Sequence, residues 1–349
     1  MSFTSKKLPF QRSYPLKQMV SRDHIKTTTT KKTDGGKTMN KRPLGKTGIE
    51  VSEIGFGTWQ LGNEKDWGKM DDQEAVDLVH EAIDQECTFF DTAPNYGLGK
   101  SESIIGEALK DKRSQVVISS KCGHHTNDEQ SFDPARLVES IEGSLRRLKT
   151  DYLDIVLLHN PPFEALTDDS AQFQVLKKLK AAGKIRFYGA SVDSSKEMDA
   201  ILKNTSSQVI EVMFNIFHQE PKDAIKRAHE QGVGIITKVP LDSGWLTGKY
   251  DEESTFTGIR ARWTKEVIEK RSQIVDKVRA IIGEDMSMSR AALQYILSVE
   301  GVSSVIPGAR NTKQLSENLR ASEQNLPEQI KVALYELWIA EIKDSPLPW

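Results

Sequence analysis

Eight short β-rich runs alternate with amphipathic helical stretches along the 349-residue chain, and this alternation limits the fold more than any other feature of the sequence. Strands that are each followed by a helix form either a doubly wound open sheet or a closed barrel. A count of eight units favours an α/β barrel of the TIM type, (β/α)8. The predicted strands cover residues 54–58, 88–92, 116–121, 153–159, 185–191, 209–215, 233–239 and 302–306.

Local signals place several helix ends. Asp133-Pro134 combines an N-cap residue with a proline at the first helical position, which predicts a helix over 133–148. Gly183 and Gly232 follow predicted helices, where a left-handed C-cap is expected. Two segments fall outside the eight units. We predict that residues 42–52 form a hairpin that plugs the bottom of the barrel, and that residues 326–342 form an extra C-terminal helix begun by Pro327.

The composition excludes several classes of protein. The net charge is −2, with 48 basic and 50 acidic residues, which gives no support for nucleic acid as a partner. There is no run of about 18 apolar residues, so no transmembrane helix is expected. Cys87 and Cys122 form no C-x-x-C pair, which argues against a disulfide scaffold or a zinc site and fits a reducing, cytoplasmic compartment. Neither glycine-rich nucleotide motif is present, which disfavours a Rossmann dehydrogenase.

The first 38 residues differ from the rest, because they contain nine Lys or Arg residues against two acids and include the run Thr27 to Thr30. The remaining residues carry a net charge of about −9. Three interpretations compete: a transit peptide, a disordered arm, or a stretch that is not translated because synthesis starts at Met39. We favour the third, because Gly35-Gly36 requires two GGN codons where a bacterial ribosome-binding sequence of the GGAGG type would lie. The barrel domain is therefore expected over 39–349.

Polar side chains stand at the ends of three consecutive predicted strands. Asp91 ends the second strand, Lys121 the third and His159 the fourth, and Tyr96 lies five residues beyond Asp91. In a TIM barrel, side chains at the carboxyl ends of the strands converge on one mouth. Singly, Lys121 could be a solvated loop lysine and His159 a satisfied histidine; together the four residues favour a catalytic site.

This cluster suits proton transfer to a carbonyl group. Tyrosine has an unperturbed pKa near 10, and a neighbouring lysine ammonium group stabilises the tyrosinate and lowers that pKa. Asp91 would keep Lys121 charged and oriented, and His159 can hydrogen-bond a carbonyl oxygen. No metal is required, and His124-His125 lacks the flanking ligands of a metal site.

Three segments carry a resemblance to a known family: FFDTAPNYGLGKSE (89–102), SSKCG (119–123) and LLHNPP (157–162). From about residue 42 to about residue 322, the chain resembles the aldo-keto reductase superfamily. The resemblance implies a (β/α)8 barrel that binds NADP(H) and reduces the carbonyl group of a small-molecule aldehyde or ketone. It implies Tyr96 as general acid, with Lys121 and Asp91 tuning it and His159 orienting the substrate.

The resemblance also implies contacts with NADPH. Positions after the first, fifth, seventh and eighth strands correspond to contacts with the nicotinamide, the pyrophosphate and the adenosine, and Arg310 lies near the 2′-phosphate. The segment around Arg310 could also be simply a strand followed by a capped helix. The implied cofactor residues are Gly57, Thr58, Trp59, Asp91, Ser191, Glu211, Lys238, Pro240, Leu241, Lys249, Gly308, Arg310, Gln314, Glu317 and Asn318.

Three positions depart from the family pattern. Val192 stands where Asn is usual and Glu211 where Gln is usual, so two carboxamide contacts are altered. Lys238 replaces a Tyr or Trp under the nicotinamide, and its long side chain could reach the pyrophosphate instead. Two other functions are kept as alternatives: a Schiff-base lyase that uses Lys121, and an NADP(H)-binding regulatory module of the potassium-channel β-subunit type.

Overall fold

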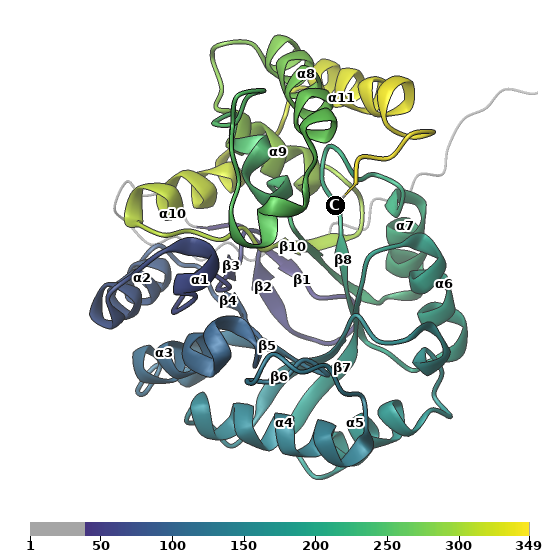
Figure 1. Ribbon diagram of the computed structural model, residues 1–349. Helices are drawn as coiled ribbons and strands as arrows, with labels where there is room; N and C mark the ends of the chain where they lie inside the picture. Colours follow the sequence, from purple (N-terminus) through teal and green to yellow (C-terminus); the bar gives the residue numbers. More distant parts are fainter. Residues whose placement is uncertain (1–38, 349) are drawn as a thin grey trace, which may run out of the picture. The chain divides into compact units, whose positions relative to one another are not determined.

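The computed structural model describes residues 39–348, and the expectations for residues 1–38 lie outside this part of the chain. Eight parallel strands form one curled sheet in the order β10-β9-β8-β7-β6-β5-β4-β3, and parallel bridges from Ile54 to Val305 and from Gly57 to Gly308 join its two edges (Figure 1). The (β/α)8 prediction is confirmed. The strands are β3 (Phe56–Gly57), β4 (Phe89–Asp91), β5 (Val117–Cys122), β6 (Leu153–His159), β7 (Ile185–Val192), β8 (Val209–Met213), β9 (Gly234–Lys238) and β10 (Val302–Val305).

Helices surround the strands and begin and end where the local signals predict. Asp133 caps α4 by accepting hydrogen bonds from the backbone N–H groups of Ala135 and Arg136. Gly183 and Gly232 adopt φ values of 75° and 80°, the left-handed conformation expected after a helix. The surrounding helices are α2 (Asp72–Asp84), α3 (Lys100–Ala108), α4 (Pro134–Arg147), α5 (Ala171–Ala181), α6 (Ser195–Asn204), α7 (Lys222–Gln231), α9 (Met288–Leu297) and α10 (Thr312–Leu319).

A helix that the sequence analysis did not predict lies between β9 and α9. It is α8 (Lys265–Ile282), preceded by the 3-10 helices η4 (Asp242–Thr247) and η5 (Gly258–Arg262). It packs beside the extra C-terminal helix α11 (Glu328–Glu341), which was predicted (Figure 1). Within residues 39–348, no helix is both long and apolar enough to cross a membrane.

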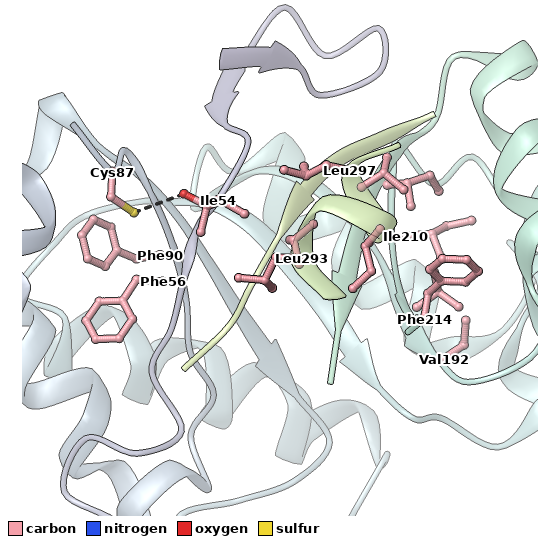
Figure 2. Packing of buried hydrophobic residues seen from close by; sticks show 14 of the residues in the cluster. Ile54, Phe56, Cys87, Phe90, Val192, Ile210, Phe214, Leu293 and Leu297 are labelled. Atoms are coloured by element: carbon pink, nitrogen blue, oxygen red, sulfur yellow. Dashed lines mark hydrogen bonds between the residues drawn. The ribbon is translucent and has the colours of Figure 1, made fainter. Parts of the chain in front are cut away.

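The hydrophobic core has two parts, one outside and one inside the barrel. The outer part lies between strands and helices: Figure 2 shows Phe56 beside Phe90, and Leu293 and Leu297 of α9 near Ile210. The inner part is closed by the predicted hairpin, β1 (Lys41–Pro43) and β2 (Glu50–Ser52). Buried Leu44 and Val51 of this hairpin region pack with inward side chains of β4, β6, β8 and β9. The barrel is therefore filled at its base, which leaves the carboxyl ends of the strands for a polar site.

Candidate active site

The alternation of side chains along each strand places the polar cluster. Phe89, Leu157 and Val209 fill the inner core, and the residues two positions further along, Asp91, His159 and Glu211, stand on the same face of their strands. The barrel interior thus changes from apolar to polar at the carboxyl ends. The predicted convergence of strand-end side chains is what the structure shows.

Lys121 lies at the centre of this cluster and its side chain is fully buried. Its Nζ is 2.5 Å from Asp91 Oδ1 and 3.3 Å from the Tyr96 hydroxyl oxygen, and it also donates to the carbonyl oxygen of Thr92 at 3.2 Å. Glu211 Oε2 is 3.4 Å from the same nitrogen. Two carboxyl groups and one tyrosine hydroxyl group therefore share a single ammonium group.

These neighbours change the pKa of both Lys121 and Tyr96. Burial alone would lower the pKa of Lys121, but Asp91, Glu211 and Tyr96 outweigh burial and raise it, so Lys121 is an ammonium ion. Burial raises the pKa of Tyr96, and the opposing effect of Lys121 does not cancel it. The expectation of a lowered tyrosine pKa is thus wrong in its net sign, although Lys121 acts in the direction expected.

His159 is a neutral histidine at the edge of the cluster. Its pKa is held well below the ordinary range, first by burial and then by the positive charges of Lys121 and Lys238 and by His124. Its ring centroid lies 6.2 Å from that of Tyr96 and 4.5 Å from that of His124. Nδ1 of His159 is buried without a hydrogen-bond partner among the described residues.

Tyr96 reaches the cluster through the tight turn η1 (Tyr96–Gly99). Gly97 has a φ of 56°, and a Cβ atom on it would lie 2.7 Å from the carbonyl oxygen of Gly62, so a side chain there would clash with backbone. Trp59 lies 6.4 Å from Tyr96 and 5.5 Å from Trp67, measured between ring centroids. Trp59 thus lies between the other two aromatic rings and contacts both.

Lys238 extends the cluster toward the rim. It donates hydrogen bonds of 2.8 Å to Ser191 Oγ and to Asn160 Oδ1, and it lies 3.0 Å from Asp193 Oδ1. Ser191 in turn donates to Glu211 Oε1 at 2.9 Å. The long side chain of Lys238 is thus engaged with the ends of β6 and β7. Asn160 and Asp193 were not predicted as site residues, although Asn160 lies inside the LLHNPP segment.

Val192, which stands where Asn is usual in the family, has an apolar side chain. Its side chain is fully buried in the outer core, near Phe214 in Figure 2, and Ser191 beside it faces the polar cluster. Val192 therefore offers no polar group to the site.

The residues predicted to hold the adenosine gather around Gly308 and the start of α10. The backbone N–H of Arg310 donates to Gln314 Oε1 at 2.9 Å, and its guanidinium group donates to the carbonyl oxygen of Lys69 at 3.2 Å. Asn318 Nδ2 donates to the carbonyl oxygen of Gly308 at 3.1 Å. The carboxylate of Glu317 accepts a hydrogen bond from Ser287 and not from these residues.

A model of the aldo/keto reductase family matches residues 53–338 of the chain. The chain belongs to the aldo/keto reductase family. The aldo-keto reductase YhdN of Bacillus subtilis (strain 168) is 34% identical over 292 residues, 79% of this chain and 87% of that protein. The NADH-specific methylglyoxal reductase of Escherichia coli (strain K12) is 30% identical over 322 residues, 86% of this chain and 98% of that protein. The solved holo form of aldo-keto reductase AKR11C1 from Bacillus halodurans superposes with a TM-score of 0.74 at 26% identity, covering 89% of this chain and 100% of its own.

As an aldo/keto reductase, the chain is an oxidoreductase of a family that uses nicotinamide cofactors and acts on small carbonyl compounds. Its residues fit such a cofactor. Gly57 and Gly308 let the ends of the first and last strands approach closely: a Cβ on Gly57 would lie 2.6 Å from Ile306 O, and a Cβ on Gly308 would lie 1.8 Å from the Gln60 side chain. Thr58, beside Gly57, donates to Asp91 O at 2.7 Å. Arg310, exposed at the start of α10, offers a guanidinium group for a phosphate.

The segment after β9 contains three more of the residues predicted to contact the cofactor. Pro240 is buried, Leu241 half-buried and Lys249 exposed, with the Lys249 ammonium group 4.6 Å from the Tyr250 ring centroid. Arg260, which the sequence analysis missed, lies 4.2 Å over the Trp67 ring and donates to the carbonyl oxygen of Ser243 at 3.1 Å. Arg260 thereby connects the segment after β9 with helix α1 (Glu64–Trp67). These segments are far apart in the sequence, so no local pattern predicts the contact.

Proposed function

We propose that this aldo/keto reductase reduces aldehydes and ketones to alcohols with NADPH, and that Tyr96 is the general acid. The observation that carries the proposal is the position of Lys121 Nζ, 2.5 Å from Asp91 and 3.3 Å from the Tyr96 hydroxyl oxygen. A neighbouring positive charge helps a general acid because it stabilises the conjugate base left after proton donation. Here the tyrosinate left after proton donation would be stabilised by the buried ammonium group of Lys121.

The chain's own residues would handle the proton. NADPH, when bound, supplies the hydride for the carbonyl carbon. The Tyr96 hydroxyl proton moves to the carbonyl oxygen, and the raised pKa of Tyr96 keeps that proton in place until the oxygen becomes basic. His159 is neutral, so it can hydrogen-bond the carbonyl oxygen and fix its approach without adding a charge.

The same electrostatics weigh against the Schiff-base lyase. A lysine nucleophile must be a neutral amine, which requires a lowered pKa. The pKa of Lys121 is raised instead, because Asp91, Glu211 and Tyr96 outweigh the effect of burial. Lys121 is therefore suited to stabilise a tyrosinate and unsuited to attack a carbonyl carbon.

We assign the preference for NADPH to Arg310. The 2′-phosphate distinguishes NADPH from NADH, and a guanidinium group binds phosphate through charge-assisted hydrogen bonds. Arg310 is exposed and lies beside Gln314 at the start of α10, where backbone N–H groups also favour an anion. One relative is named NADH-specific, so cofactor choice in this chain has to be measured on its own residues.

The test is cofactor consumption with a panel of small aldehydes, ketones and sugars, run beside borohydride trapping. We expect a fall in NADPH absorbance with at least one carbonyl compound and no covalent labelling of Lys121. Labelling of Lys121 by a carbonyl compound and borohydride, with no consumption of NADPH across the panel, would replace the reductase by the lyase.

A further inference from the structure

Glu211 places a second carboxyl group inside the barrel, next to the one that tunes Lys121. Its side chain is 1% exposed, and its Oε2 lies 3.4 Å from Lys121 Nζ. Asp91 is equally buried and contacts the same nitrogen from β4. The sheet order separates β4 from β8 by three strands, so the two acids meet across the interior and not along one sheet edge.

Each of these acids has one oxygen atom that accepts a hydrogen bond and one that accepts none. Asp91 Oδ1 accepts from Lys121, and Glu211 Oε1 accepts from Ser191. Asp91 Oδ2 and Glu211 Oε2 are buried and accept no hydrogen bond within the described part of the chain. Both carboxyl groups lie against one nitrogen atom, with Asp91 Oδ1 2.5 Å and Glu211 Oε2 3.4 Å from Lys121 Nζ. A single proton on either group would turn one of two buried acceptors into a donor for the other, which lowers the cost of two buried oxygens that accept no hydrogen bond.

We propose that Asp91 and Glu211 share one proton, and that this pair reloads Tyr96 through Lys121. The sharing is a property of the protein by itself; the reloading rests on the proposed function. Glu211 would act through Lys121 and is therefore a positioning residue.

The other charges around the pair support one shared proton. Lys121 on β5 is the cation in direct contact with both acids. Lys238 on β9 is separated from Glu211 by Ser191 and lies beside Asp193 at the rim. Tyr96 and His159, the remaining titratable groups that face the cluster, are neutral.

One proton on the pair balances the single positive charge of Lys121 with a single negative charge. The pKa of Asp91 is accordingly raised, first by burial and next by Glu211, against the opposing effect of Lys121.

The proton transfers balance. Tyr96 gives its O–H proton to the carbonyl oxygen, Lys121 gives an N–H proton to the tyrosinate oxygen, and the pair gives its proton to the Lys121 amine. The pair, now doubly ionised, takes one proton from solvent. The path from solvent to the pair runs along two hydrogen bonds, from Lys238 to Ser191 and from Ser191 to Glu211. In both bonds the donor lies on the side of the rim and the acceptor on the side of the pair. Each turnover thus consumes one solvent proton, and only O–H and N–H bonds change in the chain.

Infrared spectroscopy of the cofactor-free protein tests the shared proton directly. A protonated carboxyl group shows a C=O stretch, sensitive to exchange into D2O, that a carboxylate lacks. We expect this band in the wild-type protein at neutral pH and its loss in both Glu211→Gln and Asp91→Asn, because a single carboxylate beside Lys121 ionises. Absence of the band from the wild type, or its persistence in Glu211→Gln, would overturn the proposal.

Asp154→Asn is the matched control. Asp154 is equally buried, but it accepts hydrogen bonds of 2.8 Å from both Arg113 and Arg186, so its removal should leave the band in place. If Glu211→Gln did not fold, the presence or loss of the band in Asp91→Asn would test the shared proton instead.

The reloading is tested by the pH profile of kcat for carbonyl reduction. In the wild type, kcat should fall with rising pH at the pH where the infrared band disappears, and this limb should be missing or displaced in Glu211→Gln. An unchanged profile in Glu211→Gln would refute the reloading. A protein that reduces no carbonyl compound would refute the proposed function, while the infrared bands would still decide whether Asp91 and Glu211 share a proton.

Discussion

Arg260 lies 4.2 Å over the ring of Trp67 and thereby joins the segment after β9 to helix α1. A cation–π contact of this kind contributes about 0.5–2 kcal/mol. The contact holds the segment that resembles the phosphate-binding stretch of the family, so its loss should loosen the cofactor.

The first prediction is therefore that Arg260→Ala weakens NADPH binding by about two- to thirtyfold, mainly through faster dissociation. Stopped-flow release of NADPH measures this rate. Arg227→Ala, which removes an exposed arginine of α7 that pairs with Asp199, serves as the control and should leave the rate unchanged. A dissociation rate equal to that of the wild type in Arg260→Ala would show that this contact does not restrain the cofactor.

The second prediction concerns Arg310. A charge-assisted hydrogen bond contributes about 1.5–3 kcal/mol, which is about ten- to over a hundredfold in affinity. Arg310→Ala should weaken NADPH binding at least about tenfold and leave NADH binding nearly unchanged. Titration of both cofactors by fluorescence decides this, with Arg320→Ala, at the far end of α10, as control. Equal losses for NADPH and NADH would mean that Arg310 serves the pyrophosphate or the fold.

The third prediction concerns stability and pH. The pKa of Asp91 is raised above its ordinary value of 3.8 in the folded protein, so the folded state holds the proton more tightly than the unfolded state. This stabilisation is complete below the ordinary value and is lost as the pH rises through the raised pKa. Each unit of pKa shift corresponds to about 1.4 kcal/mol.

Glu211→Gln removes the charge that raises the pKa of Asp91, which is the largest cause of the shift next to burial. Its free energy of unfolding, relative to wild type, should therefore rise as the pH increases above 3.8, the ordinary pKa of an aspartate. Urea unfolding across this range measures the difference, and Glu50→Gln, an exposed glutamate of β2, controls for the lost charge. A difference that does not change with pH would contradict the raised pKa.

The sequence predicted the barrel and its strand-end residues because both depend on local patterns. The two-residue repeat of a strand carries Asp91 and His159 to the mouth once the strand ends are known, and the spacing of Asp91, Lys121 and His159 matches one strand and helix each. Helix α8 was not predicted, although Thr264 caps it and apolar residues recur along it, because it is an insertion between β9 and α9 that belongs to none of the eight repeating units.

What the sequence could not predict depends on contacts across the barrel. Glu211 stood out as an unusual residue, but its contact with Lys121 joins β8 to β5 through the curvature of the sheet. The sign of the Tyr96 pKa shift depends on how deeply tertiary packing buries the hydroxyl group, which no spacing reveals. Arg260 reached Trp67 from 193 positions away in the chain, so neither residue signalled the other.

The role of Tyr96 as general acid is the central claim, and Tyr96→Phe tests it most directly. The substitution removes the hydroxyl group 3.3 Å from Lys121 Nζ and keeps the ring that packs against Trp59. Carbonyl reduction under saturating NADPH should fall about 10²- to 10⁴-fold, while the Kd for NADPH stays within about twofold of wild type. Tyr152→Phe, which alters a tyrosine beneath Arg113 and away from the cluster, should reduce at the wild-type rate. Near-normal turnover by Tyr96→Phe would contradict the account.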